Sequence, residues 1–518
     1  MENAEKSAFI AAFLGGLLAH LYIYTNTIPN FDGISRVYDE QQMTVSGRWF
    51  LHYASGIYGY VQNPMLIGLL AMFFLAVAAM LTVNLLSVKN NVIAGAWGLL
   101  SVLTPAIAYT NTYTFTAAVY CFAILLATVA VWLVTDKGYK GFLIGCAVLA
   151  LSMGIYQVYV TVAITLSLYL VLAKALEDGS TAKATFLSGV RYVSFLATGT
   201  LLYYGILKIF LWKKNLKLLS YLGMNQVEQG YPVGQLGQIL ADTYREVAAY
   251  FFYNTRTSYN GAAIRSIAAI LLLICTVLLL GTYLVQKLRK ENSLKITIGV
   301  SMIILLPLGA NFGKVMSPFT ATSPIMKYSY VYICLLPVIL WKYVKQAERI
   351  RNYFVRAGVA GAFLFAFVFW QQDNTLYTML NQVHRATLSF VTNVVGRIES
   401  CPGYQMGMPV VIVGGYPADR YDTDITAYDW VEQGAILSSS VIPLNKHIYY
   451  YMQDWLNVPI EEPAQEVFEE VAASEVFRNM PRYPDDGSVQ IYDGKVIVKM
   501  QEEYTPKAQY EIDYENRR

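Results

Sequence analysis

Long runs of apolar residues recur through the first 371 residues of this 518-residue chain. A helix needs about 20 apolar residues to cross the hydrocarbon core of a bilayer. Runs of this kind, with approximate ends, occupy 7–28, 64–86, 92–110, 113–134, 189–212, 262–286, 294–311, 328–344 and 355–371. The stretch 140–176 is too long for one span, and the break "MGIYQVY" (153–159) divides it into two. The sequence therefore predicts a polytopic α-helical membrane protein with about eleven transmembrane helices.

Charge is distributed unevenly between two parts of the chain. Residues 1–371 hold 27 Lys and Arg against 13 Asp and Glu, whereas residues 372–518 hold 11 against 22. Only 14% of all residues are charged, against about 25% in typical soluble proteins. We therefore expect a basic transmembrane domain over 1–371 and an acidic, soluble domain over 372–518.

The acidic domain carries short strand and helix signals. The segment "MPVVIVGG" (408–415) is typical of a buried strand, and "SVQIYDGKVIVKM" (488–500) of a hairpin with Asp-Gly at its turn. Helices are predicted near 374–399 and over the acidic segment 459–480. Together these signals predict a small α/β or α+β domain.

Lys and Arg in the short loops predict the orientation in the membrane. With a cytoplasmic N-terminus, five strongly basic connections lie inside, and the outer side receives the loops 29–63, 213–261 and 311–327 and the acidic domain. The segment "LWKKNLK" (211–217) breaks this rule, so either the orientation differs there or its lysines meet an anion. Two outer segments are predicted to lie along the membrane as helices, one within 234–254 and a weaker one at 43–60.

The first loop, residues 29–63, places the carboxylates of Asp32, Asp39 and Glu40 beside the membrane. A carboxylate held against an acceptor can deprotonate its hydroxyl group. Lipid phosphates are bound by Arg and Lys side chains. The outer-side cations that are candidates for this role are Arg36, Arg48, Lys213, Lys214, Arg256, Lys314 and Lys327. The alternative is that these loop charges are simply solvated by water.

Few other residues are candidates for a catalytic or binding role. His20 lies in the first span, and Tyr156 and Gln157 lie in the break at 153–159. Each of them either contacts a substrate or satisfies polar groups of the neighbouring backbone and helices. The chain contains four His and lacks a Walker loop, a GxGxxG motif followed by an acid, an HExxH motif and a GxSxG motif. No acidic cluster marks a divalent-ion site, so no metal site is assigned and metal dependence stays open.

Several short motifs together resemble one family. They are "AHLYIYTNT" (19–27), "SGRWF" (46–50), "LTPAIAYTNTYTFTAAVYCFAILLA" (103–127), "SMGIYQVYV" (152–160) and "MKYSYVY" (326–332). Over most of residues 8–345 the chain resembles the bacterial Gtr-type integral-membrane glucosyltransferases, the group that includes the serotype-converting O-antigen enzymes. These belong to the GT-C class of glycosyltransferases, which use polyprenyl phosphate sugars. The acidic domain is not part of the shared core.

The resemblance implies a function and a site. It implies transfer of a hexose, glucose first, from a polyprenyl phosphate donor to a cell-envelope polysaccharide or similar exported glycan, on the non-cytoplasmic face of the bacterial cytoplasmic membrane. It implies a first-loop base, which is Asp32 here, with Asp39 and Glu40 in reserve. The GRW motif corresponds to Gly47, Arg48 and Trp49, and the YQ pair to Tyr156 and Gln157. Late-loop lysines hold the phosphate, and Lys314 and Lys327 are the nearest equivalents.

Other interpretations of the sequence are a flippase or transporter for a lipid-linked sugar, and a polysaccharide polymerase or ligase. A transporter is expected to show paired repeats or broken helices in both halves, whereas this sequence shows one break. The expected partners are the bilayer, the lipid-linked donor and the glycan acceptor, without nucleic acid. Beyond the lipid-linked donor, which is a substrate, no cofactor is indicated.

Overall fold

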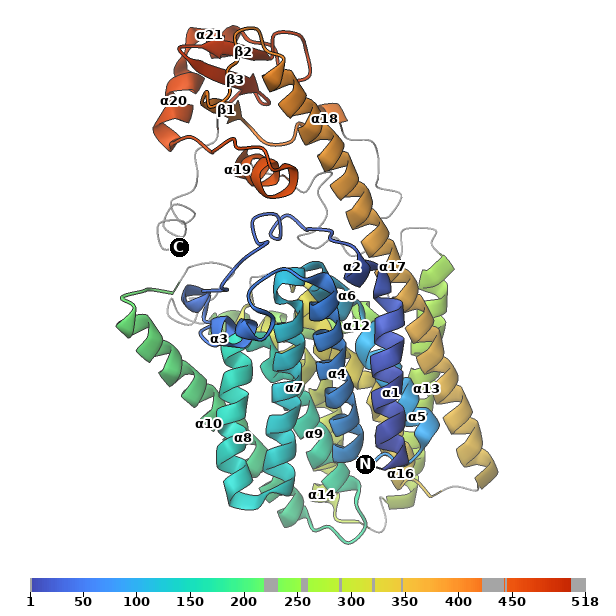
Figure 1. The fold of residues 1–518 in the computed structure, drawn as a ribbon. Coiled ribbons are helices and arrows are strands. Elements are labelled where there is room, and N and C mark those ends of the chain that lie inside the picture. Colours follow the sequence, from blue (N-terminus) through green and yellow to red (C-terminus); the bar gives the residue numbers. More distant parts are fainter. Residues whose placement is uncertain are drawn as a thin grey trace.

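The computed structural model describes residues 2–218, 232–252, 260–287, 291–318, 322–345, 348–421, 442 and 445–504. These residues form a body of long helices and a small C-terminal domain, which is carried above one end of the body by the helix α17 (Figure 1). The N-terminus lies at the opposite end of the body (Figure 1). We call the upper end the first-loop end, because residues 29–63 lie there.

Across the described residues, ten helices are long and apolar enough to cross a membrane. They are α4 (Pro64–Leu85), α5 (Asn91–Leu103) with α6 (Pro105–Thr112), α7 (Thr114–Asp136), α8 (Gly138–Ile155), η3 (Gln157–Tyr159) with α9 (Val160–Leu176), α10 (Ala182–Lys213), α13 (Asn260–Lys287), α14 (Ser293–Ala310), η5 (Pro324–Leu335) with α16 (Leu336–Tyr343), and α17 (Glu348–Glu399). All ten coincide with predicted spans. The remaining predicted span, 7–28, is divided at His20 into α1 (Asn3–Ala19) and α2 (Leu21–Thr25), and α1 has only 17 residues.

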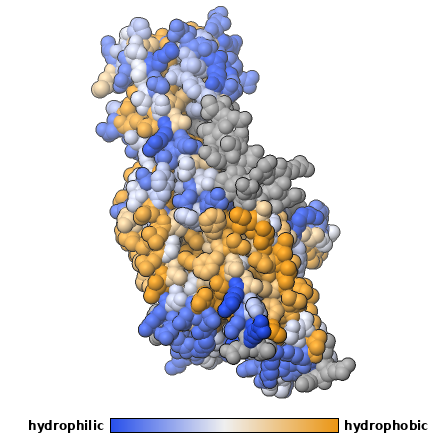
Figure 2. Space-filling view, turned by 90° about the vertical axis from the view of Figure 1, so that its right-hand side faces the viewer, coloured by the Kyte–Doolittle hydropathy of each residue, from blue (hydrophilic) through white to orange (hydrophobic). Residues whose placement is uncertain are grey.

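The outer surface of the body is apolar. On the face drawn in Figure 2, a belt of hydrophobic side chains crosses the helices between hydrophilic surfaces at both ends. On α10, for example, Val193 is 67% exposed and Leu201 is 72% exposed. An apolar belt of this extent marks a surface that is covered by lipid or protein rather than by water.

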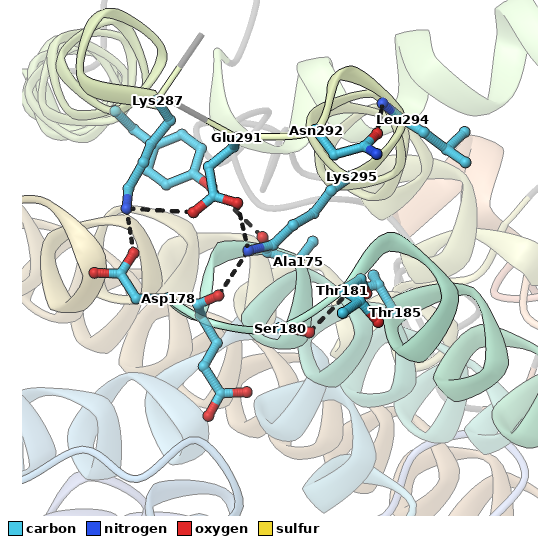
Figure 3. A network of polar contacts seen from close by, with 12 residues as sticks. Ala175, Asp178, Ser180, Thr181, Thr185, Lys287, Glu291, Asn292, Leu294 and Lys295 are labelled. Atoms are coloured by element: carbon cyan, nitrogen blue, oxygen red, sulfur yellow. Dashed lines mark hydrogen bonds and ion pairs between the residues drawn. The ribbon is translucent and has the colours of Figure 1, made fainter. Parts of the chain in front are cut away.

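The end opposite the first loop is held together by a network of charges (Figure 3). Lys295 is only 1% exposed, and its Nζ lies 3.1 Å from Glu291 Oε2 and donates to the carbonyl oxygen of Glu177 at 2.7 Å. Lys287 pairs with Asp178 and lies 3.7 Å from Glu291. The network joins two connections that the sequence assigns to the same side of the membrane.

Two predicted interfacial helices have different outcomes. The helix predicted within 234–254 is confirmed as α12 (Leu236–Phe251), which buries Ile239 and Val247, and its position along the membrane stays a prediction. The one at 43–60 is wrong: the segment forms the short turns η1 (Thr44–Ser46), α3 (Leu51–Ser55) and η2 (Gly56–Tyr58). The reason is that Gly47 and Gly59 adopt positive φ angles of 78° and 70°, which end η1 and η2.

The C-terminal domain contains a three-stranded sheet with the order β1-β3-β2. β1 (Val410–Val413) is parallel to β3 (Lys495–Lys499), and β2 (Val489–Tyr492) pairs antiparallel with β3 around an Asp-Gly turn. The predicted strand and hairpin are confirmed. The predicted helix over 459–480 is instead divided into α20 (Gln465–Ala473) and α21 (Glu475–Asn479), since Ser474 caps the second helix by accepting from the Phe477 N–H at 3.2 Å.

The remaining elements connect these parts. They are η4 (Val233–Gln235), α15 (Phe312–Met316), α18 (Ala418–Tyr421), α19 (Asn445–Tyr450) and the single π turn η7 (Tyr451–Trp455). α17 runs without interruption through the position of the predicted domain boundary at 371–372.

Candidate functional site

Asp32 lies in a tight turn that follows the first two helices. The N–H of Gly33 donates to the carbonyl oxygen of Asn30 at 3.0 Å and to its side-chain oxygen at 2.7 Å, which fixes the turn. Asp32 itself is half-buried and makes no hydrogen bond or ion pair with any described residue. Burial raises the pKa of the Asp32 carboxyl, while the charges of Arg36, Arg48 and Lys446 act in the opposite direction. Asp32 is therefore a carboxylate without a hydrogen bond or ion pair to a described residue, and three cations lie close enough to act on its charge.

The two reserve carboxylates are engaged by the loop itself. Asp39 forms an ion pair with Arg36, and it also accepts the N–H of Gln41 at 2.7 Å. Glu40 accepts from the side chain of Gln42 at 3.0 Å and from the Tyr38 hydroxyl at 3.4 Å. Both carboxylates thus stabilise the shape of the loop, whereas Asp32 is the first-loop carboxylate without a hydrogen bond or ion pair to a described residue.

The GRW motif docks into the helix break at 153–159. The Gln157 Nε2 group donates to the carbonyl oxygen of Ser46 at 2.8 Å, and the Tyr203 hydroxyl donates to that of Gly47 at 3.1 Å. The N–H of Phe50 donates to the carbonyl oxygen of Gly154 at 2.8 Å. A Cβ atom at position 47 would lie 2.2 Å from Gln157 Nε2 and 2.7 Å from the Tyr203 hydroxyl, so only glycine fits. Two motifs more than a hundred residues apart are thereby brought into one structure.

Arg48 is held by aromatic side chains. Its Nη1 donates to the Tyr120 hydroxyl at 2.8 Å, and its guanidinium carbon lies 4.7 Å from the ring centre of Tyr156. The rings of Tyr120 and Tyr156 are stacked with centres 4.8 Å apart. The Nε of Arg48 is buried without a hydrogen-bond partner, and Arg48 forms no ion pair with a described carboxylate. A fixed arginine with unused N–H groups is suited to binding an anion.

The other motif residues differ in what they can offer a substrate. Trp49 is only 5% exposed, with its ring stacked on Phe210 at 5.6 Å and packed where Gly154 leaves room. Tyr156 and Gln157 hold Arg48 and the Ser46 backbone, as described above. These three residues therefore shape the site around Arg48.

The predicted phosphate-binding cations are spread over the first-loop end. Lys214 reaches the first loop, with its Nζ 3.4 Å from Gln42 Oε1, whereas the neighbouring Lys213 is exposed at the end of α10. Lys314 lies 3.2 Å from Glu246 of α12, and Lys327 is half-buried in η5. Arg256 lies outside the described residues. Arg36 and Arg48 belong to the first loop itself, where Arg36 pairs with Asp39, and Lys214 is the described lysine of this set that reaches the loop from another element.

His20 lies in the interior of the body, fully buried. Its Nε2 is 2.9 Å from the carbonyl oxygen of Val102, so Nε2 carries the proton, and its Nδ1 accepts from the Tyr377 hydroxyl at 2.8 Å. Both ring nitrogens are therefore occupied by protein groups. Nearby, Asp373 is 1% exposed, and neither of its oxygens has a hydrogen-bond partner.

Three residues of the site were not singled out by the sequence. Tyr120 is one tyrosine within the apolar run of α7, and Tyr203 is one of several aromatic residues on α10. Lys446 belongs to the C-terminal domain, far along the chain from Asp32. Only the packing of distant segments identifies them.

Two further features bear on the chemistry. In the part of the chain that the structure describes, no three His, Cys, Asp or Glu side chains are grouped as a metal site requires. A partly open apolar pocket lies between α5, α13, α16 and α17, away from the first-loop end. Its lining includes Trp97, Trp341 and Phe354 and no charged side chain, so it offers no group for acid–base or phosphate chemistry.

Comparison with known protein families identifies this helical protein as a glycosyltransferase. Residues 21–341, more than half of the chain, match the family model described as Glucosyl transferase GtrII, and the protein belongs to that family. The predicted family resemblance is confirmed. The matched region contains the first loop and the helix break, and it ends before the C-terminal domain. Neither the curated proteins nor the solved structures yielded a match.

Proposed function

We propose that this protein transfers glucose from a polyprenyl phosphate donor to a hydroxyl group of a cell-envelope polysaccharide or a similar exported glycan. Membership of the glucosyl transferase family supports the sugar. The apolar belt supports a membrane location and, with it, a donor carried on lipid. The charge of the loops supports an arrangement in which the first-loop end faces the non-cytoplasmic side of a bacterial cytoplasmic membrane.

The observation that carries the proposal is the nearness of Asp32 to Arg48 without an ion pair between them. Each lies within electrostatic reach of the other, yet neither forms an ion pair with a described residue. A carboxylate with free lone pairs can take a proton, and an arginine with free N–H groups can hold a phosphate. Glucosyl transfer from a lipid phosphate requires both abilities a few ångströms apart.

The reaction then follows from these two groups. The acceptor hydroxyl attacks the anomeric carbon of glucose while its proton moves to Asp32. The new bond joins the acceptor oxygen to the anomeric carbon, and the bond from that carbon to the phosphate oxygen breaks. The electron pair of the broken bond remains on the polyprenyl phosphate, whose charge Arg48 stabilises. Attack from the face opposite the leaving group inverts the anomeric centre.

Two features of the site favour this chemistry. The raised pKa of Asp32 makes it a stronger base than an ordinary aspartate, provided that it is deprotonated at the working pH. Lys214, which touches the first loop through Gln42, is the next cation available to the phosphate. Of the lysines farther away, Lys314 is engaged by Glu246, which fits a role in holding α12 in place.

The test is a pair of matched substitutions in the purified protein, reconstituted in liposomes with polyprenyl phosphate glucose and an acceptor glycan. Asp32→Asn is expected to lower the transfer rate by about 100-fold or more, because the base is lost. Glu40→Gln removes the same charge from the same loop and is expected to retain activity within about twofold, since the amide oxygen of Gln can still accept from Gln42 or Tyr38. Released polyprenyl phosphate and glucosylated acceptor are measured together.

The outcomes separate the candidate functions. A folded, fully active Asp32→Asn variant would show that another group is the base. Movement of the donor across the membrane by the wild-type protein, without release of polyprenyl phosphate, would favour the transporter interpretation over glucosyl transfer.

A further inference from the structure

The C-terminal domain touches the turn that carries Asp32. Trp455 Nε1 donates to the carbonyl oxygen of Ile34 at 3.0 Å, and the ring of His447 lies 6.4 Å from that of Phe31. Phe31 and Ile34 flank Asp32 on either side in the sequence. In Figure 1, α19 lies directly over the first loop. The domain is therefore docked on the turn and not merely near it.

The docked part of the domain is also fixed to α17. His384 of α17 stacks edge-on against Trp455 with ring centres 5.3 Å apart, and its Nδ1 lies 3.1 Å from the Tyr451 hydroxyl. η7 is thus held between the helix and the first loop. This arrangement gives α19, the element just before η7, a defined position over Asp32.

α19 brings a positive charge to that position. Lys446 acts on the charge of Asp32, as do Arg36 and Arg48 from the first loop. Lys446 is the only Lys or Arg between Arg420 and Arg478 of a domain in which acidic residues predominate. Its neighbour His447 is neutral near pH 7, because burial and Lys446 lower its pKa to about 4. Of these two neighbours in α19, Lys446 is therefore the one that carries a positive charge near Asp32.

We infer that the C-terminal domain completes the transferase site, and that Lys446 binds the phosphate group of the lipid-linked donor together with Arg48. This inference rests on the function proposed above. It assigns a substrate-binding role to a domain that lies outside the region matched by the family. An anionic group on the acceptor would present similar chemistry, so the experiment measures donor and acceptor separately.

The first measurement tests the docking alone, on the full-length protein in nanodiscs. In a Cys401→Ser background, Phe31→Cys paired with His447→Cys is expected to give an intramolecular link with a short thiol crosslinker, identified by mass spectrometry of the joined peptides. The control pair, Phe31→Cys with Glu475→Cys, reaches α21 at the far end of the domain and is expected to give none (Figure 1). Equal linking of the two pairs, or of neither, would overturn the inference.

The second measurement tests the role of Lys446. Lys446→Met is expected to raise KM for polyprenyl phosphate glucose about tenfold, since a charge-assisted contact is lost. KM for the acceptor is expected to stay unchanged, and Lys446→Arg to restore donor binding. Lys495→Met is the matched control, because Lys495 pairs with Glu470 and Asp493 within the sheet region of the same domain. An unchanged donor KM in Lys446→Met, or an effect on the acceptor alone, would overturn the inference.

The two proposals fail in different ways. A wild-type protein that transfers no glucose from this donor contradicts the proposed function. Binding of a short-chain polyprenyl phosphate, followed by tryptophan fluorescence, then decides the role of Lys446 without turnover. About tenfold weaker binding by Lys446→Met than by Lys495→Met supports the role, and equal binding of the two variants refutes it.

Discussion

Gly47→Ala is expected to release the GRW segment from the helix break. The added methyl group would lie 2.2 Å from Gln157 Nε2 and 2.7 Å from the Tyr203 hydroxyl. Both groups hold this segment by hydrogen bonds to the carbonyl oxygens of Ser46 and Gly47. Neither hydrogen bond can keep its geometry when its donor is pushed away, so Arg48, the next residue, loses its fixed position.

The free-energy cost of Gly47→Ala to the docked segment has two parts. A residue with a side chain at a φ of 78° costs roughly 1–2 kcal/mol. Each of the two hydrogen bonds contributes about 1 kcal/mol, so the docked state is weakened by about 3–4 kcal/mol in total. Gly59→Ala isolates the first part, because Gly59 has a φ of 70° but no atom within 4 Å of an added Cβ. The difference of about 2 kcal/mol corresponds to roughly 30-fold in the equilibrium between docked and released segments.

Hydrogen exchange measured by mass spectrometry reads this equilibrium directly. The amides of Gly47, Arg48 and Phe50 donate to the carbonyl oxygens of Thr44, Met43 and Gly154, so they exchange when the segment opens. Peptides covering residues 43–52 are expected to exchange roughly 30-fold faster in Gly47→Ala than in Gly59→Ala, and transfer activity is expected to fall with them. Equal exchange in the two variants would refute the steric argument.

Three other outcomes are expected. Arg48→Lys lowers kcat/KM about tenfold or more, because an ammonium group cannot both donate to Tyr120 and present a planar fork to phosphate; a rate within twofold of wild type would contradict this. The transfer rate of the wild-type protein rises with pH through the raised pKa of Asp32. Lys446→Met moves this rise to higher pH, because the variant lacks a cation that favours the charged carboxylate. Superimposable pH profiles of kcat/KM for the two proteins would argue against Asp32 as the base. Lys295→Met, at the other end of the body, lowers the free energy of unfolding by about 2 kcal/mol by leaving Glu291 with a weaker pairing, while kcat/KM per folded molecule stays the same; a rate change without loss of stability would contradict it.

The sequence predicted those parts of the structure that depend on local patterns. The length of the apolar runs located the long helices, and the Asp-Gly turn located the hairpin of the C-terminal domain. The segment 43–60 was predicted wrongly because its apolar and aromatic residues suggested a helix, whereas Gly47 adopts a left-handed φ to fit beside Gln157. That close approach depends on a residue more than a hundred positions away, which a local pattern does not contain.

The candidate site was predictable in its motif residues and not in its assembly. Asp32 and Arg48 could be proposed from their place in the first loop and from the family resemblance. Tyr120, which orients Arg48, is hidden in an apolar helix where tyrosine is common, and Lys446 lies in a different domain. Such residues become functional candidates only when tertiary packing brings them beside the loop.

The uninterrupted course of α17 limits the insertions and deletions that this helix can accept. A helix of 52 residues is about 78 Å long, and each inserted residue would raise the C-terminal domain by about 1.5 Å and turn it by about 100°. One or two extra residues would therefore point α19 away from Asp32, although every local contact within the domain stayed intact. Removing seven residues would nearly restore the rotational phase but lower the domain by about 10 Å, into the first loop. The length of α17 is therefore constrained by the contact of the C-terminal domain with the first loop, and its sequence is constrained where His384 contacts Trp455.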